Sequence, residues 1–295
     1  MTANSLGKMP TPVTPSTRRR RRVGNRMGPI ASVIAWLYAL ILAIPMYYLV
    51  VSAFKTNVEI FNNPFGVPLR WLWSNFSTAW QNAQLGQALL NSALIVVVAI
   101  IITLSLAIPA AYALSRSNNR LAQVITGSFA ASFLIPPFAA LIPTVLLAIA
   151  LGLFYSREFQ MLFLPAGALP LAILLLTQFM KTIPHELVES ASMDGAGHWT
   201  ILTKIFIPLA MPGIVSVTIL QLLGFWNEYL FSLIITGTSP DVRTVQVALP
   251  TLVTTTTDFG VLAAGTVVTL IPVYIAYSFL QGRMQQALTA GAIKG

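Results

Sequence analysis

Charged residues are scarce in this sequence. They make up 8% of the 295 residues, whereas hydrophobic residues make up 56%. A soluble domain carries about a quarter charged residues. Long uncharged runs recur between residues 30 and 280, and no polar block between them is large enough to fold separately. The composition therefore excludes an ordinary soluble protein and indicates one integral membrane domain solvated by lipid.

Cysteine is absent altogether. Its absence excludes a disulfide framework, a thiolate zinc site and a cysteine nucleophile. The two histidines, His185 and His198, lie 13 residues apart without a cluster of further ligands, so we expect no metal site and no cofactor. The uncharged runs also bring no acid, base and nucleophile together, so we assign no catalytic residues.

The sequence also lacks a phosphate-binding loop. No Gly-x-x-x-x-Gly-Lys-[Ser/Thr] pattern occurs in it, and such a loop is what cradles the phosphates of ATP in the common ATPases. The chain therefore cannot hydrolyse ATP through such a site, and we predict that it is not an enzyme.

The positive charge is distributed unevenly. The formal net charge is +9, and five consecutive arginines, Arg18 to Arg22, lie just before the first apolar run. That position indicates membrane topology, because basic residues stay on the cytoplasmic side. The other cations are scattered between apolar runs, which disfavours a nucleic-acid partner. We expect residues 1–29 to form a disordered, basic cytoplasmic tail.

Six membrane spans are predicted when each crossing needs about 20 apolar residues. They cover residues 30–54, 89–114, 121–155, 161–180, 208–237 and 259–280. The third stretch is too long and contains Pro136, Pro137 and Pro143, so we expect it to kink and to include a re-entrant or interfacial piece near Leu151 to Tyr155.

The lysines and arginines agree with six crossings and with two cytoplasmic termini. In that topology thirteen of them fall inside the cell, and the four on the outside are Lys55, Arg70, Arg157 and Arg243.

The segment between the fourth and fifth spans is unusually polar. Residues 181–208 contain five formal charges, and their insertion into the bilayer would cost on the order of 15 kcal/mol. We expect two short cytoplasmic helices joined at Gly195 or Gly197. Leu187, Val188 and Ala191 would form an apolar face. A helix resting on lipid headgroups is the alternative, but the acidic residues before Gly195 disfavour an anionic membrane surface.

A spaced motif runs through this segment. Glu189-Ser190-Ala191 is followed by three residues and Gly195, then by nine residues and Ile205-Phe206-Ile207-Pro208. The pattern resembles the Glu-Ala-Ala signature of permeases in binding-protein-dependent ABC importers, with Ser190 in place of an alanine and Ile207 in place of a leucine.

The end of the chain carries a second motif. The run Gln285 to Gly295 contains Leu-Thr-Ala-Gly-Ala-Ile-Lys-Gly, which is similar to the tail of carbohydrate-uptake permeases such as the second membrane subunit of the maltose transporter. Ser52-Ala53-Phe54-Lys55 and Trp226-Asn227-Glu228-Tyr229 add to the likeness, which covers residues 28–295.

The resemblance implies an all-α, polytopic fold of the type I ABC importer permease, with six transmembrane helices and a cytoplasmic coupling helix. Its permease domain would span residues 30–283, with the coupling segment at 183–208 and a cytoplasmic tail at 284–295. The residues that would contact an ATPase subunit are Glu189, Ser190, Ala191, Met193, Asp194 and Gly195.

The same resemblance implies the partners and the function. The partners would be a second permease subunit in a heterodimer, two ATP-binding subunits and an extracytoplasmic sugar-binding protein. Together they would import a carbohydrate across a bacterial plasma membrane. By the same likeness, residues from about Thr238 to Thr257 would face the sugar-binding protein.

Polar residues of the fifth predicted span are candidates for the sugar path. Glu228 is the one formal charge well inside a predicted span, and an intramembrane carboxylate is functional or paired. Gln221 lies seven residues earlier, on the same face of a continuous helix. Trp226, Asn227 and Tyr229 complete the set. A polar cluster that packs helices together is the alternative interpretation.

Three tryptophans, Trp71, Trp73 and Trp80, lie between the first two spans. An aromatic belt at the membrane interface is the favoured interpretation, and a sugar-stacking platform is the other.

An ion-driven secondary transporter of a small polar solute is the alternative function. It would show internal repeats and several intramembrane charges. The sequence has one such charge and no evident repeat.

Overall fold

The computed structural model describes residues 28–292, with side chains described up to Gly282 except that of Pro137. All but the last two residues of the predicted basic tail, and the final three residues of the C-terminal motif, lie outside this range. Every regular element within it is helical, as predicted. The chain divides into two units, residues 1–45 and 46–295, so α1 (Pro29–Ser52) crosses the division.

Four helices of the described residues are long and apolar enough to cross a membrane. They are α1, α4 (Leu85–Arg116), α7 (Arg157–Lys181) and the part of α14 (Phe259–Ala292) up to Gly282. Two bent pairs of helices meet the same test, one within residues 120–150 and one within residues 198–226. Counting each pair as one span gives the predicted six.

The third predicted span is sharply bent. It consists of α5 (Arg120–Ala131), η1 (Ser132–Leu134), η2 (Pro137–Ala140) and α6 (Leu141–Ala150), with a 90° bend between its halves. The bend lies at Pro136 and Pro137, because proline cannot supply a helical amide hydrogen. Leu151 to Tyr155 form the turn into α7, and the Tyr155 amide donates to the Ile235 carbonyl at 2.9 Å.

The fifth span differs from the prediction of one helix over residues 208–237. After α10 (Ile207–Leu209) the chain bends by 74° into α11 (Met211–Trp226), and α12 (Leu230–Thr236) follows separately. The Asn227 side chain donates to the Leu223 carbonyl at 2.9 Å, and the Glu228 carboxylate accepts from the Phe231 amide at 2.8 Å. These side chains satisfy backbone groups at both helix ends, which stabilises the break.

The core of the larger unit lies where α4, α7 and α11 meet. Small residues such as Ala107, Ala111 and Ala172 are fully buried there, and they allow the helix backbones to approach closely. A second cluster joins α3 (Ser74–Asn82), the start of α4, α13 (Val245–Ala248), η4 (Leu249–Leu252) and α14.

The segment after α1 is folded. It contains α2 (Asn57–Asn62) and α3, and the buried ammonium group of Lys55 donates to the carbonyls of Asn63 and Pro64 at 2.8 and 3.3 Å. Trp71 and Trp73 are exposed, and each meets the Phe54 ring edge to face at 4.9 Å.

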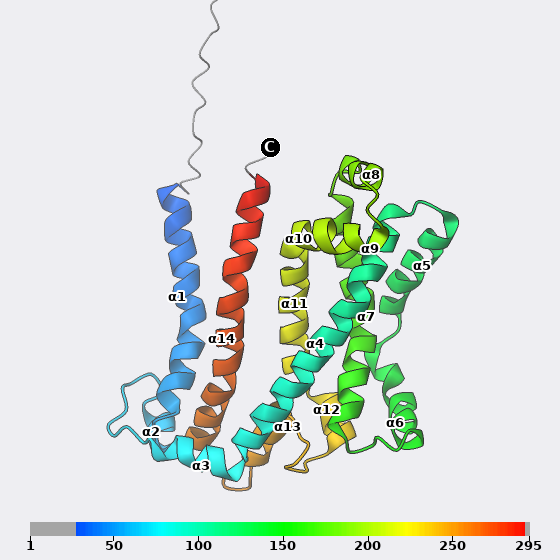
Figure 1. The fold of residues 1–295 in the computed structure, drawn as a ribbon. Helices are drawn as coiled ribbons and strands as arrows, with labels where there is room; N and C mark the ends of the chain where they lie inside the picture. Colours follow the sequence, from blue (N-terminus) through cyan, green and yellow to red (C-terminus); the bar gives the residue numbers. More distant parts are fainter. Residues whose placement is uncertain (1–27, 293–295) are drawn as a thin grey trace, which may run out of the picture. The chain divides into compact units, whose positions relative to one another are not determined.

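Within the larger unit, the segment from α8 (Glu186–Met193) to α10 lies at the same end as the C-terminal end of α14 (Figure 1). The helices α2, α3 and α13 lie at the opposite end. The polar segment is therefore separated from α2, α3 and α13 by the length of the spanning helices.

The contact between α7 and α11 yields a stability prediction. A Cβ atom added at Gly213 would lie 2.5 Å from Cγ of Phe179, whereas one added at Gly224 of the same helix would meet nothing within 4 Å. We expect Gly213→Ala to destabilise the protein by about 1–3 kcal/mol through overpacking. Gly224→Ala should be neutral or slightly stabilising. Thermal unfolding of the purified variants measures both, and equal melting temperatures would contradict the prediction.

Candidate functional site

The helix α8 ends in a glycine turn. The Ala196 amide donates to the Ala191 carbonyl at 2.9 Å, and the Gly195 amide donates to the Ser192 carbonyl at 3.0 Å. Gly195 has a φ of +81°, the left-handed conformation that glycine adopts at little cost. The arrangement is a Schellman motif. Gly195 therefore stops the first helix and Gly197 precedes the second, so the predicted junction of two short helices contains both candidate glycines.

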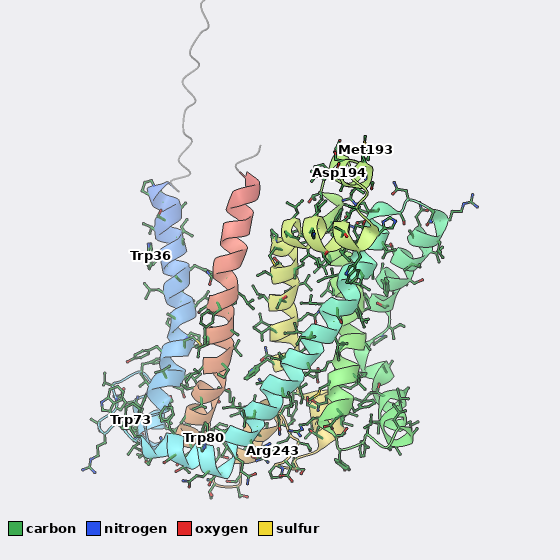
Figure 2. All side chains as sticks on the ribbon, in the orientation of Figure 1. Trp36, Trp73, Trp80, Met193, Asp194 and Arg243 are labelled. Atoms are coloured by element: carbon green, nitrogen blue, oxygen red, sulfur yellow. The ribbon has the colours of Figure 1, made fainter. Side chains whose placement is uncertain are left out.

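Most of α8 is exposed. Val188 and Ala191 pack against the core cluster together with Ala196, whereas Leu187 of the predicted apolar face is 41% exposed. Of the predicted coupling residues, Ala191 faces this cluster, and the exposed ones are Glu189, Ser190, Met193, Asp194 and Gly195. Met193 is 90% exposed, and Figure 2 shows Met193 and Asp194 at the tip of this end.

The second half of the segment packs more deeply. It runs through α9 (His198–Ile201), a π-helical turn η3 (Leu202–Phe206) and α10. Ile201, Leu202 and Phe206 are buried. The wider turn lies just before Pro208, which cannot donate a backbone hydrogen bond. This half therefore anchors the segment while α8 stays accessible.

Arg116, at the end of α4, holds the segment in place. Its Nη2 donates to the carbonyls of Met180 and Ile183 at 2.7 and 2.8 Å. Its Cζ lies 4.5 Å from the centroid of the Phe206 ring, and the Tyr112 ring meets that ring at 4.7 Å. One guanidinium thus joins α4, the end of α7 and η3, through charged hydrogen bonds and a cation–π contact.

In the sequence, Arg116 is one of the thirteen cations predicted to lie inside the cell, and this gives it no special role. The available signal was a single arginine closing a 32-residue apolar helix, where a cation can reach backbone carbonyls. Its partners lie 64 and 67 residues further along the chain, so no local pattern identifies them.

The candidate sugar-path residues are divided between two settings. Gln221 and Trp226 are buried, at 5% and 6% exposure, and the amide of Gln221 lies 3.4 Å from the Ala168 carbonyl. Asn227, Glu228 and Tyr229 form the break between α11 and α12. The predicted shared face of Gln221 and Glu228 is wrong, because α11 ends at Trp226 before it reaches Glu228.

The break also contacts α13. The Gln246 side chain donates to the Asn227 side-chain oxygen at 3.3 Å. Tyr229 is 40% exposed. Asn227, Glu228 and Tyr229 therefore lie together at the break that follows α11, whereas Gln221 and Trp226 are buried within α11.

A second polar network lies at the opposite end of the larger unit. Buried Arg243 donates from Nη2 to the Ala83 carbonyl at 2.8 Å and from Nη1 to the Thr238 carbonyl at 3.1 Å. Buried Asn91 donates to the carbonyls of Asp241 and Arg243, both at 3.0 Å, and accepts from Arg157 at 2.9 Å. Burial lowers the pKa of Arg243, but a guanidinium keeps its proton.

Comparison with known proteins identifies the family. The family described as binding-protein-dependent transport system inner membrane component matches residues 103–289. This range covers more than half of the chain. The chain belongs to this family.

Two relatives of known name support this membership. The diacetylchitobiose uptake system permease protein NgcG of Streptomyces coelicolor is 30% identical over 273 residues, which cover 92% of this permease and 90% of NgcG. The trehalose transport system permease protein SugB of Mycobacterium tuberculosis is 31% identical over 233 residues, which cover 78% and 84% of the two chains.

A solved structure supports the fold. A chain of a bacterial ABC transporter involved in the import of the acidic polysaccharide alginate aligns with a TM-score of 0.74 at 23% identity. The alignment covers 86% of this permease and 94% of that chain. The predicted permease fold is thus confirmed.

The contacts of Arg116 yield a testable prediction, for which the nearby Arg120 provides a control variant. We expect Arg116→Ala to leave the buried carbonyl of Ile183 without its donor, at about 1–3 kcal/mol, whereas the Met180 carbonyl still accepts from the Ile183 amide at 3.3 Å. Residues 183–206 should then exchange amide hydrogens faster than in the wild type. The exposed Arg120, four residues on, gives the control Arg120→Ala, which should leave exchange unchanged. Equal exchange in both variants would contradict the role of Arg116.

Proposed function

We propose that this permease is the membrane subunit of an ATP-driven importer that carries a carbohydrate across a bacterial plasma membrane. The observation that carries the proposal is α8, an exposed helix that bears the Glu189 to Gly195 motif on one end of a membrane bundle. A helix so weakly covered by its own chain is suited to contact another subunit. The sugars in the names of its relatives support the substrate class.

The energy comes from a separate polypeptide in this proposal. The sequence has no phosphate loop, so two ATP-binding subunits supply the hydrolysis. A second permease subunit completes the path across the membrane, and an extracytoplasmic sugar-binding protein delivers the substrate. The exposed residues of α8 contact one ATP-binding subunit, with Met193 as the apolar contact and with Glu189 and Asp194 as partners for basic groups.

The proposed topology places both termini and α8 in the cytoplasm. The basic residues before α1 support this orientation. Residues 1–29 then form the cytoplasmic tail, residues 30–283 the permease domain and residues 284–295 a second cytoplasmic tail. The α3–α4 junction and residues 238–258 face the outside.

Force reaches the spanning helices through the Arg116 contacts. Closure of the ATP-binding subunits displaces α8, and the rigid segment behind it moves with α4 and α7 because Arg116 joins all three. Two arrangements of the paired permease subunits then open the path alternately to each side.

The interrupted fifth span supplies the candidates for sugar contact. Asn227, Glu228 and Tyr229 bring an amide, a carboxylate and an aromatic ring to a helix break, a feature that transporters use at their substrate sites. Burial of Gln221 and Trp226 favours a role in helix packing for these two residues.

The glycine turn provides the test of coupling. Gly195 and Gly197 both have open space where a Cβ would lie, but Gly195 has a φ of +81° and Gly197 a φ of −74°. We expect Gly195→Ala to strain the turn by about 1–2 kcal/mol. Uptake should fall several-fold while the protein stays in the membrane and ATP hydrolysis by the partner subunits continues. Gly197→Ala should transport normally.

The same assay separates ATP-driven transport from ion-driven transport. Proteoliposomes containing the assembled transporter should import sugar with internal ATP and the binding protein, and not with a membrane potential alone. Normal uptake by Gly195→Ala, sustained by the potential without ATP, would show a secondary transporter instead.

The substrate class has its own test. We expect the transporter purified with its binding protein to retain a carbohydrate that mass spectrometry identifies. A bound amino acid, peptide or metal ion would overturn the assignment to sugars.

A further inference from the structure

A pocket opens where α3 meets α4. It has a volume of about 410 Å³, and its lining includes Trp80, Gln81, Gln84, Gly86, Gln87 and Asp241. Trp80 and Arg243 lie near each other at this end of the larger unit, opposite Met193 and Asp194 (Figure 2). In the proposed topology the pocket therefore faces the outside of the cell.

The lining has the chemistry of a carbohydrate site. Three carboxamides and one carboxylate line the pocket and offer both the donors and the acceptors that sugar hydroxyls need. The indole of Trp80, 48% exposed, adds an apolar face. Within the described part of the chain, the side chains of Gln81, Gln84 and Asp241 make no hydrogen bond to protein groups, so they are free for a ligand.

Gly86 sets the position of the aromatic wall. A Cβ atom at this residue would lie 2.9 Å from Cζ2 of Trp80, so the ring packs where only glycine leaves room. Gln84, just before it, adopts the left-handed conformation with a φ of 46°. The turn at Gln84 and Gly86 thus orients Trp80, which forms the first wall of the pocket.

The second wall is tied to the first by buried groups. Arg243, 5% exposed, reaches the Ala83 carbonyl at 2.8 Å, and Asn91, 0% exposed, reaches the Asp241 carbonyl at 3.0 Å. Segments about 150 residues apart are therefore fixed against each other. A pocket held in this way is preorganised, which reduces the ordering that binding requires.

We propose that this pocket binds one ring of a neutral sugar at the outer face of the transporter, before the sugar enters the path across the membrane. The proposal rests on the proposed function for the substrate class and for the direction of transport. Trp80 stacks against the ring, and Gln81, Gln84 and Asp241 bind its hydroxyls. This assigns Trp80 to a sugar-stacking role, separate from that of Trp71 and Trp73.

Saturation-transfer NMR on the assembled transporter in nanodiscs, without the binding protein, tests the pocket. The probes are trehalose, melibiose and N,N′-diacetylchitobiose. We expect ring protons of at least one probe to receive saturation from the wild type. Trp80→Ala should reduce that signal at least fivefold, and Gln81→Ala, which alters an exposed side chain, at least twofold.

Trp71→Ala is the matched control, because Trp71 is 54% exposed on the same end but does not line the pocket. Its signal should equal that of the wild type. Melting temperatures of the variants show whether each remains folded. If Trp80→Ala fails to fold, Gln81→Ala still tests the pocket.

Three results would overturn the pocket. The first is a saturation-transfer signal that persists in both Trp80→Ala and Gln81→Ala, and the second is a signal that Trp71→Ala reduces as much as they do. The third is no signal from any probe with the wild type, together with weaker capture of the sugar-binding protein by Trp80→Ala. The last would identify a protein-docking surface. Sugar uptake by the wild-type transporter in proteoliposomes, with internal ATP and the binding protein, separates the two claims. Uptake together with an NMR signal that the pocket variants do not change rejects only the pocket, whereas no sugar uptake rejects the proposed function.

Discussion

The guanidinium group of Arg116 joins elements that the chain itself keeps far apart. It binds two carbonyls at the end of α7 and lies on the ring of Phe206, and it does so from the last residue of α4. Helix α8 packs against the core through small apolar contacts. Its position therefore depends on what anchors the residues on either side of it, and Arg116 is the group that contacts both sides.

The opposite end of the larger unit follows the same physical rule. Arg243 is buried there and binds the carbonyls of Ala83 and Thr238. In a chain with 8% charged residues, two arginines are thus used to satisfy backbone groups where spanning helices end. A buried carbonyl without a hydrogen-bond donor is costly. Each arginine therefore stabilises one specific arrangement of the segments that it joins, whereas apolar packing is non-directional. One junction holds the segment around η3, and the other holds the two walls of the pocket lined by Trp80 and Asp241.

Local signals in the sequence predicted much of the architecture. Uninterrupted apolar runs predicted the spanning helices, and Pro136 and Pro137 predicted the kink. The glycines Gly195 and Gly197 predicted the turn that ends α8. The break at Asn227 was missed, because the apolar run continues through it and the two capping hydrogen bonds depend on side-chain conformation. The contacts of Arg116 with Met180 and Ile183, and of Arg243 with Ala83, were missed because the chain separates these partners by 64, 67 and 160 residues.

Because the sequence contains no cysteine, a single introduced thiol can test whether α8 is the surface through which an ATP-binding subunit acts. Met193→Cys places a single thiol at a side chain that is 90% exposed on α8, and Trp73→Cys places one at a side chain that is 68% exposed at the opposite end. A benzophenone attached to each thiol is photolysed in the assembled transporter. We expect crosslinks to an ATP-binding subunit from position 193, altered by ATP, and none from position 73. Crosslinks from position 73 and none from position 193 would contradict this expectation.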